Sequence, residues 1–249
     1  MEKSRNKRMQ DWDRFFRIVQ ECDPYGHLRS IHNGRVLYDH AQPWVTHVSL
    51  QDARHLASLK AGDLRKKYRK PIVFDECRYE GDIPQSWGNL SAHELVHYFW
   101  SGTMAGCYVG HGETLKHPED LLWWAKGGVL RGQSPARIAF LRKIMEPVPF
   151  EEFTPGELEP GQLVLSRPAG EYFVYCTSAD PVTLELPGKV PFKVDGFDTW
   201  EMTTVYQGTA RPGKAVLAPP VPRCLFRLQP CAPGEKLRPA AAAGNAPCA

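Results

Sequence analysis

The sequence has little charge of one sign, no long hydrophobic run and no apolar N-terminal segment. Its 31 Lys and Arg residues nearly balance 28 Asp and Glu residues over 249 positions, so a net charge of +3 gives no sign of a nucleic-acid partner. No stretch approaches the roughly 20 apolar residues that cross a bilayer, and the charged N-terminus lacks the apolar core of a signal peptide. We therefore expect a cytoplasmic protein with neither nucleic acid nor membrane as a partner.

Closely spaced cysteines and glycine-rich loops are also missing. The seven cysteines include no CxxC pair, which favours free thiols in a reducing compartment. For Cys77 we weigh a catalytic thiol against a small core residue, and the residue type favours the core. The pair Gly127 and Gly128 lacks the neighbouring glycines of a phosphate-binding loop. No cofactor is expected.

The region up to residue 146 alternates amphipathic and short apolar stretches, which is typical of β/α units around a parallel sheet. Helices are predicted over 10–22, 52–69, 91–105 and 119–125, the last continuing into 134–146. Strands are predicted over 28–32, 45–50, 71–76 and 107–111. Ser91 and Glu94 have the spacing of a capping box, and Pro135 suits the first turn of a helix.

The composition and periodicity of the chain change near residue 147, where prolines become frequent and the helical periodicity ends. Short strands separated by Pro or Gly turns are predicted over 162–166, 171–176, 182–186, 190–194, 200–206, 214–218 and 223–228. They favour a small β-sandwich domain over 147–231. The final stretch, 232–249, is rich in Ala, Pro and Gly, and we expect it to be disordered.

The stretch KPIVFDECRYEGD at 70–82 carries the strongest chemical signal. An apolar strand brings Glu76 to its carboxyl end, and Tyr79 and Glu80 follow in the next turn. Glycosidases need two carboxyl groups beside the reacting sugar, one as acid and one as nucleophile or base. The alternative is that Glu76 makes an ion pair at a strand end. Asp75 is expected to point to the opposite side of the strand and is the weaker candidate.

A competing motif, His-Glu-Leu-Val-His at 93–97, fits the HExxH pattern of zinc metallopeptidases. A metzincin continuation would need Gly and His where Trp100 and Thr103 stand. Glu113 or Glu119 stays open as a third ligand, but the capping box already explains the glutamate of the motif. We therefore expect no metal here.

Four runs resemble the C-terminal half of the apiosidase-like glycoside hydrolases, which are retaining (β/α)8 enzymes. These runs are WDRFFRIVQECDPYGHLRSIHNG, YDHAQPWVTHVSLQD, the segment from Lys70 to Leu115 and DLLWWAKGGVLRGQSPARIAFLRKIME. The resemblance covers 10–146, and FDTWEMTTVYQG at 197–208 is similar to the small β domain that follows this barrel. It implies an α/β region holding strands five to eight of a (β/α)8 (TIM) barrel over 1–146, followed by the all-β sandwich.

The resemblance also implies the roles of individual residues. Glu76 matches the nucleophile at the end of strand seven, whereas the acid/base carboxyl belongs to strand four, before Met1. The resemblance thus implies a truncated glycosidase acting on an oligosaccharide or glycoside, with self-association through an open barrel edge at 28–32. The residues expected to bind substrate are His32, Asn33, His47, Gln51, Tyr79, Glu80, His111, Glu113, Trp123 and Trp124. A non-catalytic carbohydrate-binding remnant and the zinc metallopeptidase remain the alternatives.

Overall fold

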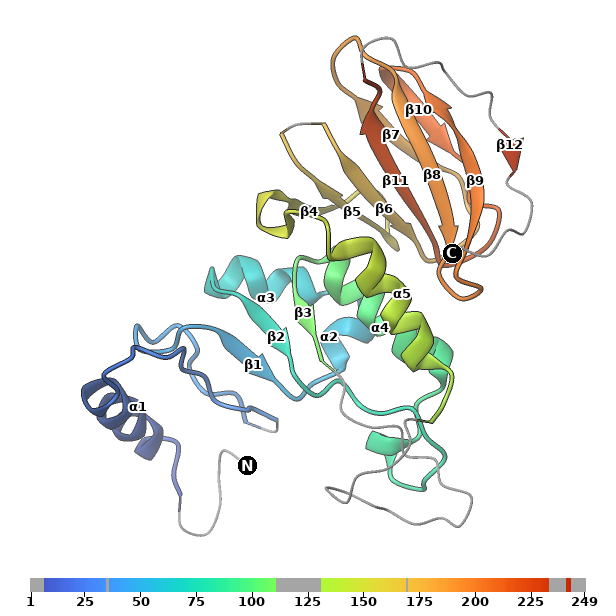
Figure 1. The fold of residues 1–249 in the computed structure, drawn as a ribbon. Helices are drawn as coiled ribbons and strands as arrows, with labels where there is room; N and C mark the ends of the chain where they lie inside the picture. The colour runs from blue at the N-terminus through green and yellow to red at the C-terminus, as the bar shows by residue number, and fades with distance from the viewer. Residues whose placement is uncertain (1–6, 35, 111–130, 169, 233–240, 243–249) are drawn as a thin grey trace. The chain divides into compact units, whose positions relative to one another are not determined.

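The computed structural model describes residues 7–34, 36–110, 131–168, 170–232 and 241–242 (Figure 1). The chain divides into two compact units, the first comprising Met1–Thr103 and Cys107–Gly132 and the second Met104–Gly106 and Gln133–Ala249. The domain boundary expected at 146 stays a prediction. Within the described ranges, no helix is long and apolar enough to cross a membrane.

The first unit holds a parallel sheet of three short strands in the order β1-β2-β3. The strands are β1 (Val48–Leu50), β2 (Ile72–Phe74) and β3 (Tyr108–Val109). Leu50 pairs with Phe74, and Phe74 pairs with Val109, so the carboxyl ends of all the strands lie at one edge. The unit is therefore α/β, as predicted, although each strand is shorter than its predicted range.

Four helices accompany this sheet in the sequence, and one predicted helix is divided. The helices are α1 (Asp11–Cys22), α2 (Arg54–Ala57), α3 (Ala61–Tyr68) and α4 (Ala92–Met104). The single helix predicted over 52–69 was wrong, because Leu59 adopts a left-handed φ of 58° between α2 and α3. At the start of α4, the Ser91 N–H donates to Glu94 Oε2 at 3.2 Å and the Glu94 N–H donates to Ser91 Oγ at 3.3 Å, which confirms the capping box.

The predicted strand over 28–32 is also wrong, because this segment is extended but does not form a regular ladder. Its contacts mix backbone and side-chain groups. The Arg29 carbonyl accepts from the Thr46 N–H at 2.9 Å, but the Arg29 N–H donates to Thr46 Oγ1 at 2.6 Å and the Ser30 hydroxyl donates to the His47 carbonyl at 2.9 Å. A single bridge then pairs Asn33 with Leu50. The segment still lies beside β1, which places the residues around 32 near the carboxyl edge.

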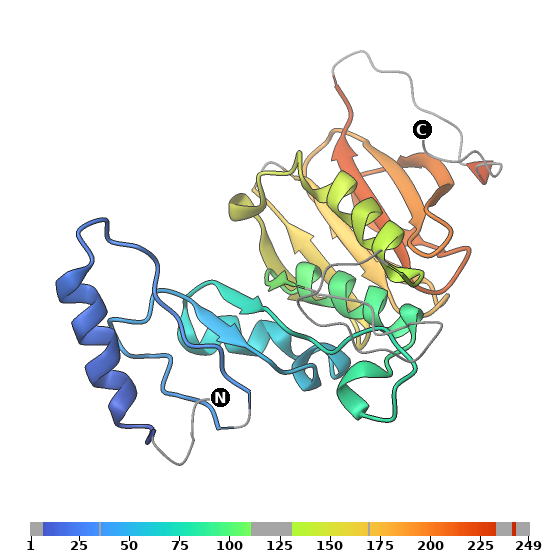
Figure 2. The same cartoon turned by 60° about the horizontal axis from the view of Figure 1, so that its bottom comes forward.

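Helix α1 packs on the extended segments that precede β1 (Figure 2). Phe16 of this helix is buried with Ile31, Tyr38 and Val45. The rings of Phe16 and Tyr38 stack with their centroids 5.7 Å apart. This apolar cluster holds the irregular segment that carries His32.

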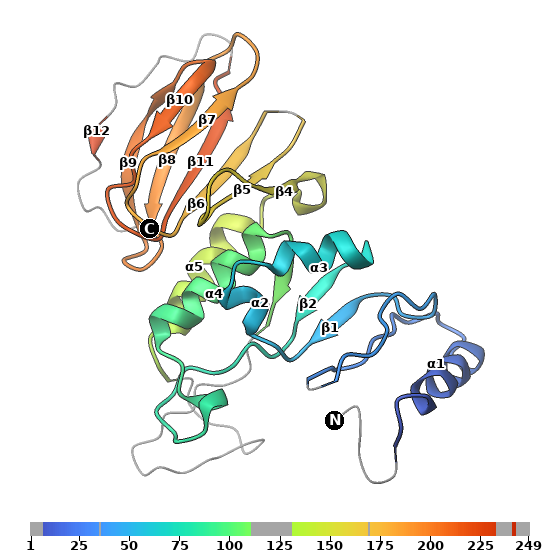
Figure 3. The ribbon, with the colours of Figure 1, turned by 180° about the vertical axis from the view of Figure 1, so that it is seen from behind.

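The second unit contains helix α5 (Ser134–Met145), with Pro135 in its first turn, followed by antiparallel sheets. Its strands are β4 (Thr154–Glu157), β5 (Gln162–Ser166), β6 (Tyr172–Cys176), β7 (Val182–Leu186), β8 (Phe192–Asp198), β9 (Thr203–Ala210), β10 (Gly213–Leu217), β11 (Cys224–Pro230) and β12 (Ala241–Ala242). The larger sheet has the order β12-β9-β8-β11-β6-β5-β4, and β10 pairs with β7 (Figure 3).

One apolar core joins these two sheets, since it includes Leu184 and Leu217 from the smaller sheet and Val174 and Phe226 from the larger. Each of the seven predicted strands overlaps one of the observed strands β5 to β11. Strand β4 was not predicted; its Pro155 is tolerated because the strand lies at the sheet edge. Apart from β12, the tail beyond residue 232 lies outside the described residues.

Candidate functional site

Two carboxylates and one imidazole meet at the carboxyl edge of the parallel sheet. Strand β2 ends at Phe74, and the next two residues are Asp75 and Glu76. The His32 ring lies between them, with Nδ1 2.9 Å from Asp75 Oδ2 and Nε2 3.0 Å from Glu76 Oε2. The Ser49 hydroxyl, from β1, also donates to Asp75 Oδ2. One ring therefore connects both carboxylates.

The charges of this site favour a protonated His32. Burial alone would lower the pKa of His32, but its hydrogen bond to Asp75 and the charges of Asp75 and Glu76 outweigh that effect and raise the pKa. An imidazolium donates from both ring nitrogens, whereas neutral imidazole donates from only one. The Glu76 side chain is 26% exposed, so a solute can reach it while it stays bonded to His32.

The prediction that Asp75 and Glu76 point to opposite sides was wrong, since both reach the same ring. The alternation of side chains holds only within a strand, and residue 75 already lies in a bend beyond β2. The second oxygen of Asp75, Oδ1, is buried and has no hydrogen-bond partner in the described part of the chain. Asp75 is thus held by its Oδ2 contacts to His32 and Ser49.

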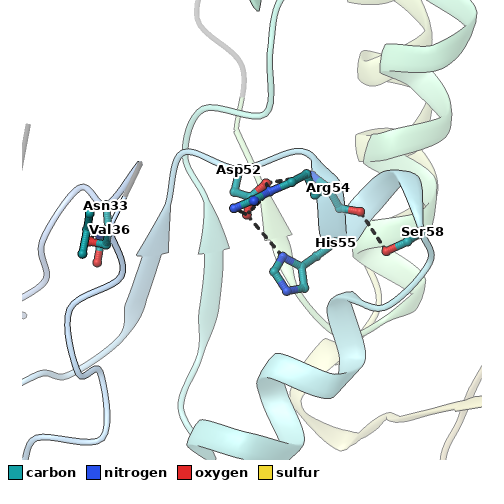
Figure 4. A network of polar contacts seen from close by, with 6 residues as sticks. All are labelled: Asn33, Val36, Asp52, Arg54, His55 and Ser58. Carbon is teal, nitrogen blue, oxygen red and sulfur yellow. Dashed lines mark hydrogen bonds and ion pairs between the residues drawn. The ribbon is translucent and has the colours of Figure 1, made fainter.

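An open pocket of about 510 Å³ lies among the residues that follow β1 and β2. Its lining includes Gly34, Gln51, Asp52, Arg54, Arg78 and Tyr98. The Asp52 carboxylate accepts hydrogen bonds from Arg54 Nε at 3.0 Å and Arg54 Nη2 at 2.8 Å, and His55 Nδ1 lies 3.4 Å away (Figure 4). Although burial raises the pKa of Asp52, these bonds to Arg54 bring it below its usual value.

The residues predicted to bind substrate differ in their surroundings. Asn33 is buried, where its Nδ2 donates to the Val36 carbonyl at 2.6 Å and its Oδ1 accepts from the Tyr38 N–H, so it closes a loop (Figure 4). Gln51 is exposed and lines the pocket. His47 comes just before β1, at the end of the strand away from Glu76.

Tyr79 and Glu80 lie in the turn beyond the site. The Tyr79 N–H donates to the Trp87 carbonyl at 2.9 Å, and the two rings meet edge to face. Glu80 is fully buried, and its carboxylate lies so close to Gly132 that a Cβ there would come within 2.6 Å of it. Glu80 therefore faces the interior. The remaining candidates lie outside the described residues: His111, Glu113, Trp123 and Trp124.

The HExxH motif lies in the first turns of α4, where Glu94 accepts from the Ser91 hydroxyl. His93 is exposed and His97 is half-buried. Across the described ranges, no three His, Cys, Asp or Glu side chains gather as metal ligands would. The capping interpretation of Glu94 is confirmed, while Glu113 and Glu119 lie outside the described residues.

Arg54, Arg78 and Tyr98 were not among the predicted site residues. The pairing of Leu50 with Phe74 brings Arg54 and Arg78 to one edge, because each follows one of these strands, whereas Tyr98 comes from α4. Strand pairing is a tertiary interaction, and the pattern of a single sequence does not reveal it. Asp52 could have been found by its place two residues after a strand.

No family profile and no curated protein matches this chain. Among solved structures, a protein from Bacteroides vulgatus ATCC 8482, provisionally described as a glycoside hydrolase, is 29% identical with a TM-score of 0.74. The match covers 90% of this chain and 49% of that one. A glycoside hydrolase family 5 structure from the same organism has a TM-score of 0.67 at 17% identity and is covered over 59% of its length.

A third structure, described as a glycoside hydrolase, has a TM-score of 0.66 at 14% identity, with 88% of this chain and 61% of that one covered. The chain therefore has a glycoside hydrolase-like fold. It spans about half the length of the first of these neighbours.

Proposed function

We propose that this chain forms the C-terminal half of a retaining (β/α)8 glycosidase barrel followed by a small β-sandwich domain, with Glu76 as the nucleophile. The observation that carries the proposal is the position of Glu76, accessible at the carboxyl edge of a parallel sheet and bonded to His32. Active sites of such barrels are built at that edge. The likeness to glycoside hydrolase structures supports the same assignment.

In the proposed reaction, Glu76 Oε attacks the anomeric carbon of a glycoside. The bond from that carbon to the leaving oxygen breaks, and the oxygen takes up a proton from a second carboxyl group. The family resemblance implies that this acid belongs to strand four of the whole barrel, outside these 249 residues. Water then hydrolyses the glycosyl ester and frees Glu76.

His32 and Asp75 act as positioning residues in this proposal. The His32 imidazolium donates to Glu76 Oε2 over 3.0 Å and holds this carboxylate in position. Asp75 binds the other ring nitrogen and fixes the orientation of the ring. Asp75 Oδ2 already binds Ser49 and His32, so Asp75 does not supply the missing acid.

The test uses glycosides that need no acid, namely 2,4-dinitrophenyl 2-deoxy-2-fluoroglycosides of a panel of sugars. Their leaving group departs without a proton, and the fluorine slows hydrolysis of the glycosyl ester, so a covalent adduct should accumulate on Glu76. Peptide mass spectrometry locates it. The Glu76→Gln variant should form no adduct, whereas Asp82→Asn, which removes an exposed carboxylate nearby, should form it normally.

An adduct on another carboxylate, or labelling that persists in Glu76→Gln, would show that the nucleophile is misassigned. Binding of sugars with no adduct to any side chain would instead identify a carbohydrate-binding remnant.

A further inference from the structure

Arg54, the first residue of α2, and Arg78, in the loop after β2, both line the open pocket at the carboxyl edge of the sheet. We propose that this pocket, formed by Gln51, Asp52, Arg54, Arg78 and Tyr98 and called here the arginine pocket, binds the carboxylate of a uronic acid residue in the substrate. That the carboxylate belongs to a sugar rests on the proposed function. The volume, about 510 Å³, lies within the range of small-ligand sites.

Arg54 is held in place before any ligand arrives. Its Nε and Nη2 bind Asp52, whose side chain is only 4% exposed, while the Arg54 side chain is 78% exposed. Arg54 Nε and Nη2 are thus fixed to the protein, while most of the side chain stays accessible to a ligand. A fixed planar guanidinium suits a planar carboxylate, because it loses little conformational freedom on binding.

Arg78 supplies the charge that Asp52 does not offset. Its Nε donates to the Ser86 carbonyl at 2.8 Å and its Nη2 to Asn89 Oδ1 at 3.0 Å, and both of these acceptors are neutral. Two guanidinium groups against the single carboxylate of Asp52 leave the arginine pocket with one net positive charge.

The backbone of Arg78 gives an independent indication. Its φ of 78° lies in the left-handed region, which a residue with a side chain adopts at a cost. Glycine would relieve that strain but would remove the guanidinium from the pocket. The observed arginine is consistent with a role for its side chain at this place.

The arginine pocket and the nucleophile share one edge of the sheet. Arg78 follows Glu76 by two residues, and Gln51 follows Leu50, which pairs with Phe74. A sugar whose carboxylate lies in the arginine pocket therefore belongs to a glycan that extends past Glu76. This proximity makes the arginine pocket a specificity determinant for acidic glycans.

The test compares sugars that differ only in the charged group. NMR titration of the full chain would measure the Kd of D-glucuronate and D-galacturonate against D-glucose and D-galactose, with glucose 6-sulfate as a second anion. The uronates should bind at least about tenfold more tightly than the neutral sugars, a difference of about 1.4 kcal/mol. In Arg78→Gln and Arg54→Gln this preference should fall to within about threefold.

Lys66→Gln serves as the matched control, since it removes an exposed positive charge of α3 outside the arginine pocket and should leave the preference unchanged. Thermal unfolding of each variant would verify that it is folded. Equal affinity for uronates and neutral sugars, no measurable binding, or an undiminished preference in both arginine variants would overturn the inference. Tight binding of the sulfate but not of the uronates would also overturn it.

The outcome is separable from the test of Glu76. If the nucleophile is misassigned, fluoroglycoside labelling fails while the preference for uronates persists, also in Glu76→Gln. If the arginine pocket does not bind carboxylates, labelling of Glu76 proceeds and the preference is missing.

Discussion

Replacing Asp75 by Asn should lower the pKa of His32, because the change removes a negative charge and keeps the shape of the side chain. Asp75 Oδ2 lies 2.9 Å from His32 Nδ1, and the His32 side chain is 48% exposed. Solvent therefore screens the pair, and the expected energy lies between that of an exposed ion pair and that of a buried one. We take about 1 kcal/mol for the pair, so its loss should bring the pKa of His32 back toward the ordinary value.

The sign of the pH dependence follows from the raised pKa of His32. Protonation of His32 stabilises the fold fully below its unfolded pKa, near 6.5, and the stabilisation is lost as the pH rises through the higher folded value. Raising the pH from about 5.5 to about 8.5 removes the stabilisation that His32 protonation provides. The resulting loss in the free energy of unfolding should therefore be larger for the unsubstituted protein than for Asp75→Asn.

NMR titration of the His32 ring measures the pKa directly, and urea denaturation at the two pH values measures the stability. Asp63→Asn, which removes an exposed carboxylate on α3, is the control and should leave the His32 titration unchanged. An unchanged or higher pKa of His32 in Asp75→Asn would refute the assignment of the bridge as an ionic one.

Three further outcomes are expected. Gly132→Ala should lower the free energy of unfolding by at least about 1 kcal/mol, since φ is +94° and the new Cβ would meet the Glu80 carboxylate; an unchanged urea midpoint would contradict this contact. Phe226→Ala should cost about 3–5 kcal/mol in the second unit, as the ring is 1% exposed, and a loss under about 1 kcal/mol would show that this core is loosely packed. Burial raises the pKa of the Cys77 thiol to about 12, so iodoacetamide should label exposed Cys22 at least about 100-fold faster; comparable rates by peptide mass spectrometry would indicate that Cys77 is accessible.

Much of the secondary structure could be predicted because its signals are local. Helix α1 has an apolar face, α5 begins with Ser134 and Pro135, and the strands of the second unit are separated by turn residues. The break between α2 and α3 could not be predicted, because the left-handed residue there is Leu59, a residue type that favours helices. The segment 28–32 has the composition of a strand, but its Arg29 N–H donates to the Thr46 hydroxyl instead of a backbone carbonyl.

The sequence predicts where the site lies better than it predicts which residues form it. Glu76 lies near the carboxyl edge, two residues beyond the end of β2, although the predicted strand extended to Glu76 itself. The role of Asp75 could not be predicted, since it depends on the bend that follows β2. Glu80 is a carboxylate, as a second catalytic residue would be, but it is buried with Gly132 packed against its carboxylate. Such an approach between distant residues leaves no mark in the local sequence pattern.

The strand register connects these separate segments into one site. Leu50 pairs with Phe74, and Asn33 bridges to Leu50, so residues 33, 50 and 74 lie side by side, and Gln51 and Asp75 follow them at the edge of the sheet. A shift by one residue would turn every side chain to the other face. What opposes that shift is the burial of Ile72 and Phe74, both 0% exposed, because the shift would move these apolar side chains out of the core. The contacts of Asp75 and Glu76 with His32 therefore depend on the packing of apolar residues in the neighbouring strands.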